Sequence, residues 1–162
     1  MAASDTSLDH WIHQAITTHL RMSLSLDDGE LLAKLAREAA QVLDVPIVFS
    51  LVDAHGQQRL FFSMDNALLI GHSLATQKAW TAVALQVATH ELTTRVQPGG
   101  DLYGLESNKN LCCFGGGFPC WSDGQLLGGI GISGGSVEED MRIARQALAR
   151  FSALRYSLTA TR

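Results

Sequence analysis

Three of the six histidines lie within residues 8–20, LDHWIHQAITTHL, and imidazole is the commonest metal-binding side chain in proteins. If this stretch is a helix and His10 is set at 0°, His13 falls at about 300° and His19 at about 180°. The three rings therefore cannot bind one metal ion together. His10 and His13 lie on the polar side of the predicted helix, whereas His19 lies in its apolar face.

The apolar face around His19 is formed by Leu8, Ile12, Ala15 and Ile16. Two interpretations of His19 remain open. It packs in a core or against another subunit, or it is an axial ligand of haem iron, since a porphyrin needs a neutral imidazole and flat apolar surface. The chain has no CxxCH attachment motif, so such a haem would be b-type and held without a covalent bond.

The composition indicates one globular domain without nucleic-acid or membrane partners. The chain has 162 residues, 46% of them hydrophobic and 17% charged, and a net charge of −4. Basic residues are scattered, and no apolar run approaches the roughly 20 residues of a membrane helix. With no signal peptide recognisable, we expect a cytoplasmic protein. Expected boundaries are a linker at 1–7, a single domain at 8–158 and a tail at 159–162.

The first half of the domain is predicted to contain a helix, a hairpin and two further helices. SLDD at 25–28 has the form of a capping box ahead of a helix with apolar residues at helical spacing. Residues 46–53 and 57–65 read as two strands joined by a tight turn. Residues 73–85 and 88–96 are predicted to form helices before Pro98.

The second half is predicted to contain a strand, a second hairpin and a last helix. NLCCF at 110–114 is a strand by composition, and the SDG turn at 122–124 joins the strands of the hairpin. Ser136 and Glu139 cap the final helix. Helices covering a sheet of antiparallel neighbours define an α+β fold, with five strands expected.

The cysteines and the glycine-rich stretches carry no recognisable catalytic motif. The spacing of Cys112, Cys113 and Cys120 fits neither a disulfide framework nor a zinc site, so we interpret them as reduced thiols. A small enzyme using Cys113 or Cys120 as a reactive thiol remains an alternative. FGGGFP at 114–119 and GGIGISGG at 128–135 lack phosphate-loop and dinucleotide fingerprints, and close backbone packing is their expected use. No catalytic residue is assigned.

The chain resembles the HbpS/GlcG-like domains, formerly a domain of unknown function, over residues 26–150. The motifs that carry the resemblance, in order, are VPIVFSLVDAHGQQ, LATQKAWTA, PGGDLYGL, FGGGFPC and DGQLLGGIGISGGSVEEDMRIARQAL. Within this family, CCFGGG and THELTTRVQPG most resemble the C-terminal domains of PduO-type propanediol-utilisation corrinoid adenosyltransferases.

The resemblance implies a profilin-like sandwich, haem binding and homo-oligomers, with dimers assembling further, up to an octamer. Adenosyltransferase chemistry would belong to a covalently linked cobalamin adenosyltransferase domain, whose ATP-binding motifs are not found here. One His19 from each of two chains would give bis-histidine iron at a subunit interface beside Ala15 and Ile16. His13 is the second choice of ligand and His10 the third.

This interpretation predicts an accessory domain with a redox, sensing or assembly role in cobalamin-dependent propanediol utilisation. It would lie in the cytoplasm, with a bacterial microcompartment as a possible location. A different class of function remains open, namely a non-catalytic module that oligomerises and docks to a corrinoid adenosyltransferase or a microcompartment.

Overall fold

The computed structural model describes residues 5–20 and 23–162, and it describes side chains for residues 7–14 and 23–162. No helix in these ranges is long and apolar enough to cross a membrane. The helices, in chain order, are α1 (Asp5–Leu20), α2 (Leu26–Leu43), α3 (Ile70–Leu85), the 3-10 helices η1 (Thr89–Leu92) and η2 (Leu105–Ser107), and α4 (Val137–Leu154). The strands are β1 (Val48–Asp53), β2 (Gln58–Ser63), β3 (Gly117–Ser122) and β4 (Gln125–Ser133).

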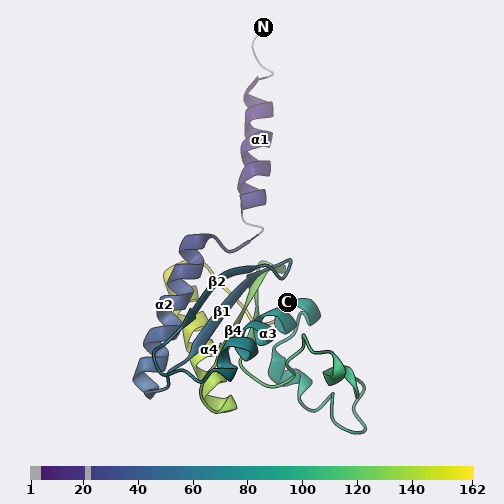
Figure 1. Cartoon of the computed structure of the whole chain (residues 1–162). Helices are drawn as coiled ribbons and strands as arrows, with labels where there is room; N and C mark the ends of the chain where they lie inside the picture. The colour runs from purple at the N-terminus through teal and green to yellow at the C-terminus, as the bar shows by residue number, and fades with distance from the viewer. Residues whose placement is uncertain (1–4, 21–22) are drawn as a thin grey trace.

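The strands form one antiparallel sheet in the order β2-β1-β4-β3. Helices α2 and α4 pack together on one face of this sheet, and α3 covers the other (Figure 1). Strand β1 is buried along nearly its whole length because both of its faces are covered. The predicted α+β class and the two hairpins are confirmed.

The expected fifth strand at 110–114 is wrong, because the described sheet has four strands. At Cys112 and Cys113, side chains and not a neighbouring strand bind the backbone of this segment. The N–H of Cys112 donates to Oγ1 of Thr81 at 3.0 Å, and Oγ1 of Thr93 donates to the carbonyl of Cys113 at 2.9 Å. The apolar composition that suggested a strand instead anchors a buried loop.

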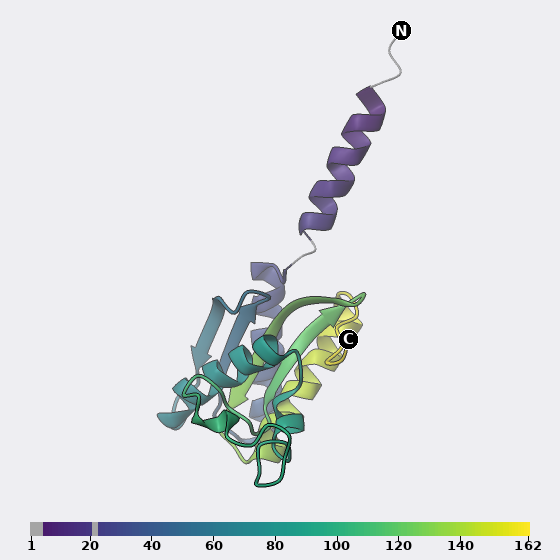
Figure 2. The same cartoon turned by 90° about the vertical axis from the view of Figure 1, so that its right-hand side faces the viewer.

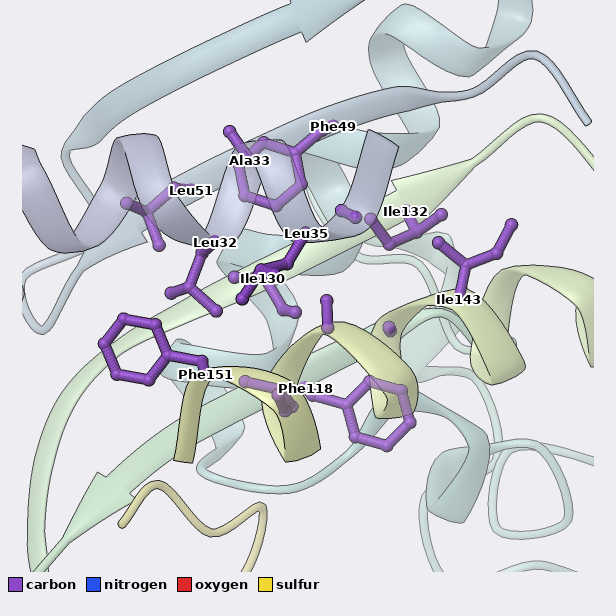
Figure 3. Close-up of a cluster of buried hydrophobic side chains, with 14 of the residues drawn as sticks. Leu32, Ala33, Leu35, Phe49, Leu51, Phe118, Ile130, Ile132, Ile143 and Phe151 are labelled. Carbon is purple, nitrogen blue, oxygen red and sulfur yellow. The ribbon is translucent and has the colours of Figure 1, made fainter. Parts of the chain in front are cut away.

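The main core lies between the sheet and the pair α2 and α4. Alternation along β1 points Phe49 and Leu51 into this core, where they meet Leu32 and Leu35 of α2 (Figure 3). The same alternation of side chains in β4 places Ile130 and Ile132 in this core. Two capping boxes fix the starts of the helices, Ser25 with Asp28 for α2 and Ser136 with Glu139 for α4, as the sequence predicts.

The glycines of β4 allow α3 to lie directly against the sheet. A Cβ at Gly131 would come 2.0 Å from the carbonyl oxygen of Ala75, and one at Gly129 would come 3.0 Å from that of Ala79. A Cβ at Gly117 of β3 would likewise come 2.4 Å from the carbonyl oxygen of Lys78. Close packing of backbone on backbone is therefore the structural use of these glycines.

Helix α1 extends away from the rest of the described chain in both views (Figures 1 and 2). The helix begins at Asp5, so part of the stretch expected to be a linker is helical. At the other end of the chain, Thr159 exchanges two backbone hydrogen bonds of 2.8 Å with Trp121. The C-terminal segment thus covers part of the outer edge of β3.

Candidate functional site

The predicted histidine-bearing helix is present as α1, and its described side chains are exposed. Apolar Leu8 and Ile12 are 59% and 47% exposed, and Trp11 is 70% exposed. His10 and His13 are exposed as well. The side chains of Ala15, Ile16 and His19 lie outside those that the structure describes. Helical geometry nevertheless puts position 19 on the same side of α1 as Leu8 and Ile12.

The described residues bring no group of three metal-binding side chains together. His72 lies on α3, where its Nε2 is 2.9 Å from Oγ of Ser63 and its ring meets Phe61 edge-on. His90 lies on η1 beside the ring of Phe118, and its Nδ1 is buried without a hydrogen-bond partner among the described residues. Burial, assisted by the charge of Arg145, lowers the pKa of His90, which favours the neutral ring.

A buried ion pair lies beneath the FGGG turn. Nζ of Lys78 donates to Oδ2 of Asp140 at 2.7 Å and to the carbonyl of Ile132 at 2.9 Å. Oδ1 of Asp140 accepts the N–H of Gly135 at 2.9 Å, and the ring of Phe114 lies over the ammonium. Burial raises the pKa of Asp140, and the charge of Lys78 opposes that shift.

Nothing in the sequence pattern had connected Lys78 with Asp140, which are 62 positions apart. One signal was available, since Lys78 sits among the apolar residues of a helix that is covered by the sheet. The ion pair joins α3 to α4. Asp140 also accepts the N–H of Gly135, which lies just before the start of α4. The N–H of Ser136 donates to Glu139, so the N–H groups of Gly135 and Ser136 both have side-chain partners at the start of α4.

All three thiols are buried, and none has the lowered pKa of a reactive thiolate. Cys112 and Cys113 are each 3% exposed, and Cys120 is fully buried. Burial raises the pKa of each thiol, that of Cys120 to about 12. The arrangement therefore does not support the alternative of an enzyme that uses Cys113 or Cys120 as a nucleophile.

The sheet, the helix pair and the motif order together define a known class of domain. A family model described as "Haem degrading protein HbpS-like" matches residues 24–149. The chain belongs to this HbpS-like family.

Two curated relatives are both named "Corrinoid adenosyltransferase PduO". The protein from Citrobacter freundii is 51% identical over 140 residues, which are 85% of this chain and 42% of the relative. The protein from Salmonella typhimurium is 54% identical over 130 residues, which are 79% of this chain and 39% of the relative. The chain thus spans about two-fifths of the length of these relatives.

Solved structures support the same assignment. The structure of a "PduOC:Heme Complex" matches with a TM-score of 0.81 and 49% identity, covering 86% of this chain and 99% of the other. A structure of HbpS matches with a TM-score of 0.73 and 27% identity, covering 79% of this chain and 89% of the other. The resemblance to HbpS-like domains and to PduO-type proteins is confirmed.

Proposed function

We propose that this chain is a haem-binding accessory domain that holds iron between two histidines at a subunit interface. The observation that carries the proposal is the similarity of nearly the whole domain to a chain solved as a complex with haem. The description of the family points to the same ligand. The haem would be b-type and bound without a covalent link, because the chain has no CxxCH motif.

The described side chains of α1, those of residues 7–14, suit the binding of haem. Leu8 and Ile12 present apolar surface that nothing in the described chain covers, and a porphyrin ring requires such surface. Position 19 follows on the same side of the helix, so we assign His19 as the axial ligand, with Ala15 and Ile16 beside the ring. His13 and His10, on the other side, are the second and third choices.

A helix that extends from its own domain is accessible to a second copy (Figure 2). In a symmetric dimer, a residue beside the two-fold axis faces the same residue of the other chain, so an axis that passes position 19 would let two His19 side chains bind one iron. Bound haem would supply a one-electron redox centre with both axial positions filled. Redox sensing, electron transfer or haem-dependent assembly therefore fit better than oxygen chemistry.

We further propose that the domain works beside a covalently linked cobalamin adenosyltransferase domain. The support is that the chain aligns with only about two-fifths of each PduO relative. Its place would then be cobalamin-dependent propanediol utilisation in the cytoplasm, inside a bacterial microcompartment where one is formed.

Haem titration followed by absorbance tests the assignment of His19. The full chain should give the spectrum of low-spin six-coordinate iron, and His19→Ala should lose it. His10→Ala, which removes an imidazole from the polar side of the same helix, is the matched control and should bind as wild type does. Added imidazole should restore the low-spin spectrum of His19→Ala. A low-spin spectrum that persists in His19→Ala would refute the assignment.

A second candidate function is a non-catalytic module for oligomerisation or docking. It is favoured by apolar side chains exposed where α3 begins: Leu68, Leu69 and Ile70 are 62%, 84% and 59% exposed. Phe61 of β2 is 39% exposed, and β2 is an edge strand that pairs only with β1 in the described sheet. A stable oligomer that forms equally with and without haem would favour this candidate over the first.

A further inference from the structure

A cavity of about 320 Å³ lies where the start of α2, the β3–β4 turn and the C-terminal segment meet. Its polar lining comes from the start of α2, from the β3–β4 turn and from the segment after α4: Ser23, Ser25, Asp28, Ser122, Asp123, Gln125 and Tyr156. Neither the haem proposal nor the buried ion pair uses any of these groups.

Asp28 is the central polar group of this cavity. The residue is only 7% exposed, although a carboxylate is rarely buried unless its oxygens are satisfied. Its Oδ2 accepts the N–H of Ser25 and the hydroxyl of Tyr156, each at 3.1 Å. Among the described residues no donor reaches Oδ1. The cavity is therefore lined by a carboxylate oxygen of a largely buried residue, and this oxygen has an unused capacity to accept a hydrogen bond.

Tyr156 fixes the position of that carboxylate. Its hydroxyl donates to Asp28, while its ring packs edge-on against Phe151 of the main core at 5.4 Å. Burial and the neighbouring carboxylate raise the pKa of Tyr156, so the hydroxyl stays protonated and remains a donor. Because this donor is directed at Oδ2, it leaves Oδ1 for another partner.

The charged side chains that line the cavity indicate which kind of ligand it can bind. Its described lining includes two carboxylates, Asp28 and Asp123, and no Lys, Arg or His. Arg155 lies near enough to lower the pKa of Tyr156, but it is exposed and does not line the cavity. An anionic ligand would meet two negative charges without a cation, whereas a protonated amine would form a charge-assisted hydrogen bond with Asp28.

We propose that this cavity binds a small organic cation whose ammonium group donates to Oδ1 of Asp28. Leu127 and the ring of Tyr156 would contact the carbon part of the ligand, and Gln125 and the serine hydroxyls would accept or donate at its polar substituents. Tyr156 acts as a positioning residue, because it holds the carboxylate.

The test is a titration of the full chain, without haem, with matched pairs of probes followed by NMR. Ethanolamine and isobutylamine carry the ammonium, and ethylene glycol and isobutanol are their neutral counterparts. At least one amine should shift signals of residues around Asp28 and bind about tenfold or more tightly than its neutral counterpart. Binding by neither amine, or equal binding of amine and alcohol, would overturn the proposal.

Substitutions locate the site. Asp28→Asn removes the charge but keeps an oxygen that can accept from Ser25 and Tyr156, and it should weaken amine binding about tenfold or more. Asp27→Asn alters an exposed acid in the same turn of α2 and should bind as wild type does. Tyr156→Phe should weaken binding less than Asp28→Asn. Thermal melts would verify that each variant is folded, and unchanged affinity in a folded Asp28→Asn would overturn the proposal.

Discussion

Nζ of Lys78 lies 2.7 Å from Oδ2 of Asp140, and both side chains are almost completely buried. The contact joins α3, on one side of the sheet, to the start of α4 on the other. Because the carbonyl of Ile132 and the N–H of Gly135 complete the hydrogen bonds of the pair, neither charge is left unsatisfied in the folded state.

Removal of one member of this pair should strongly destabilise the fold. Lys78→Met or Asp140→Leu leaves the other charge buried without a partner, which costs about 3 to 5 kcal/mol of unfolding free energy. The double variant should lose less than the sum of the two single losses. Denaturant unfolding measures each value.

The exposed pair of Arg150 with Glu38, 2.8 Å apart, is the control. Arg150→Ala should cost no more than about 1 kcal/mol, because solvent screens that pair. Equal losses at the two pairs would contradict the account of the buried one.

Gly131→Ala should destabilise the protein by about 4 kcal/mol or more, since the new methyl group would meet the backbone of α3 at 2.0 Å. Gly29→Ala is a matched control, because the closest atom to its methyl group would be the end of the flexible Leu51 side chain, at 2.8 Å, and Ala favours a helix. Thermal unfolding of the two variants compares them. A mild effect at Gly131 would show that α3 does not need this close approach.

The stability of the protein should fall at alkaline pH because of the buried thiols. The pKa of Cys120 is about 12 in the folded protein, against about 8.5 in an unfolded chain. Above about pH 8.5 the unfolded chain loses this proton while the folded protein keeps it, so unfolding becomes easier as the pH rises. The loss should be about 1 to 2 kcal/mol between pH 8 and pH 10.

Cys120→Ala provides the comparison. The variant should be less stable at pH 7 because a buried group is lost, but its unfolding free energy should fall less steeply between pH 8 and pH 10. Denaturant unfolding over this range measures both slopes. Parallel slopes would mean that Cys120 ionises equally in both states.

Leu69→Asp should reduce the size of any oligomer that forms through the apolar surface at the start of α3. Val42→Asp changes an equally exposed apolar residue, 81% against 84%, on α2, and should leave the assembly unchanged. Light scattering coupled to size exclusion gives the mass of each variant. If both variants keep the wild-type mass, the surface around Leu69 is not an assembly interface.

Local signals in the sequence predicted most of the fold. The SLDD box, the turn between β1 and β2, and the cap at Ser136 each depend on a few adjacent residues, and each is present. The strand expected at Cys112 and Cys113 failed because its hydrogen-bond partners, Thr81 and Thr93, come from distant segments. Composition does not reveal such long-range contacts.

The candidate sites likewise differ in whether a local sequence pattern could predict them. Helical periodicity predicts that His19 lies in the apolar face of a helix, and its side chain lies outside those that the structure describes. The cavity around Asp28 depends on Tyr156, 128 positions away in the chain, which no local pattern connects to the cap of α2. The pair of Lys78 and Asp140 is equally invisible to local patterns, because the two residues lie 62 positions apart.

The most direct test of the central claim is the amount and spin state of haem bound at saturation, measured on wild type beside His19→Ala. We expect half an equivalent of haem per chain in wild type, with low-spin six-coordinate iron in a species of at least dimeric mass, and the loss of that species in His19→Ala. One haem per chain, or a spectrum and stoichiometry that His19→Ala leaves unchanged, would contradict bis-histidine binding between two chains.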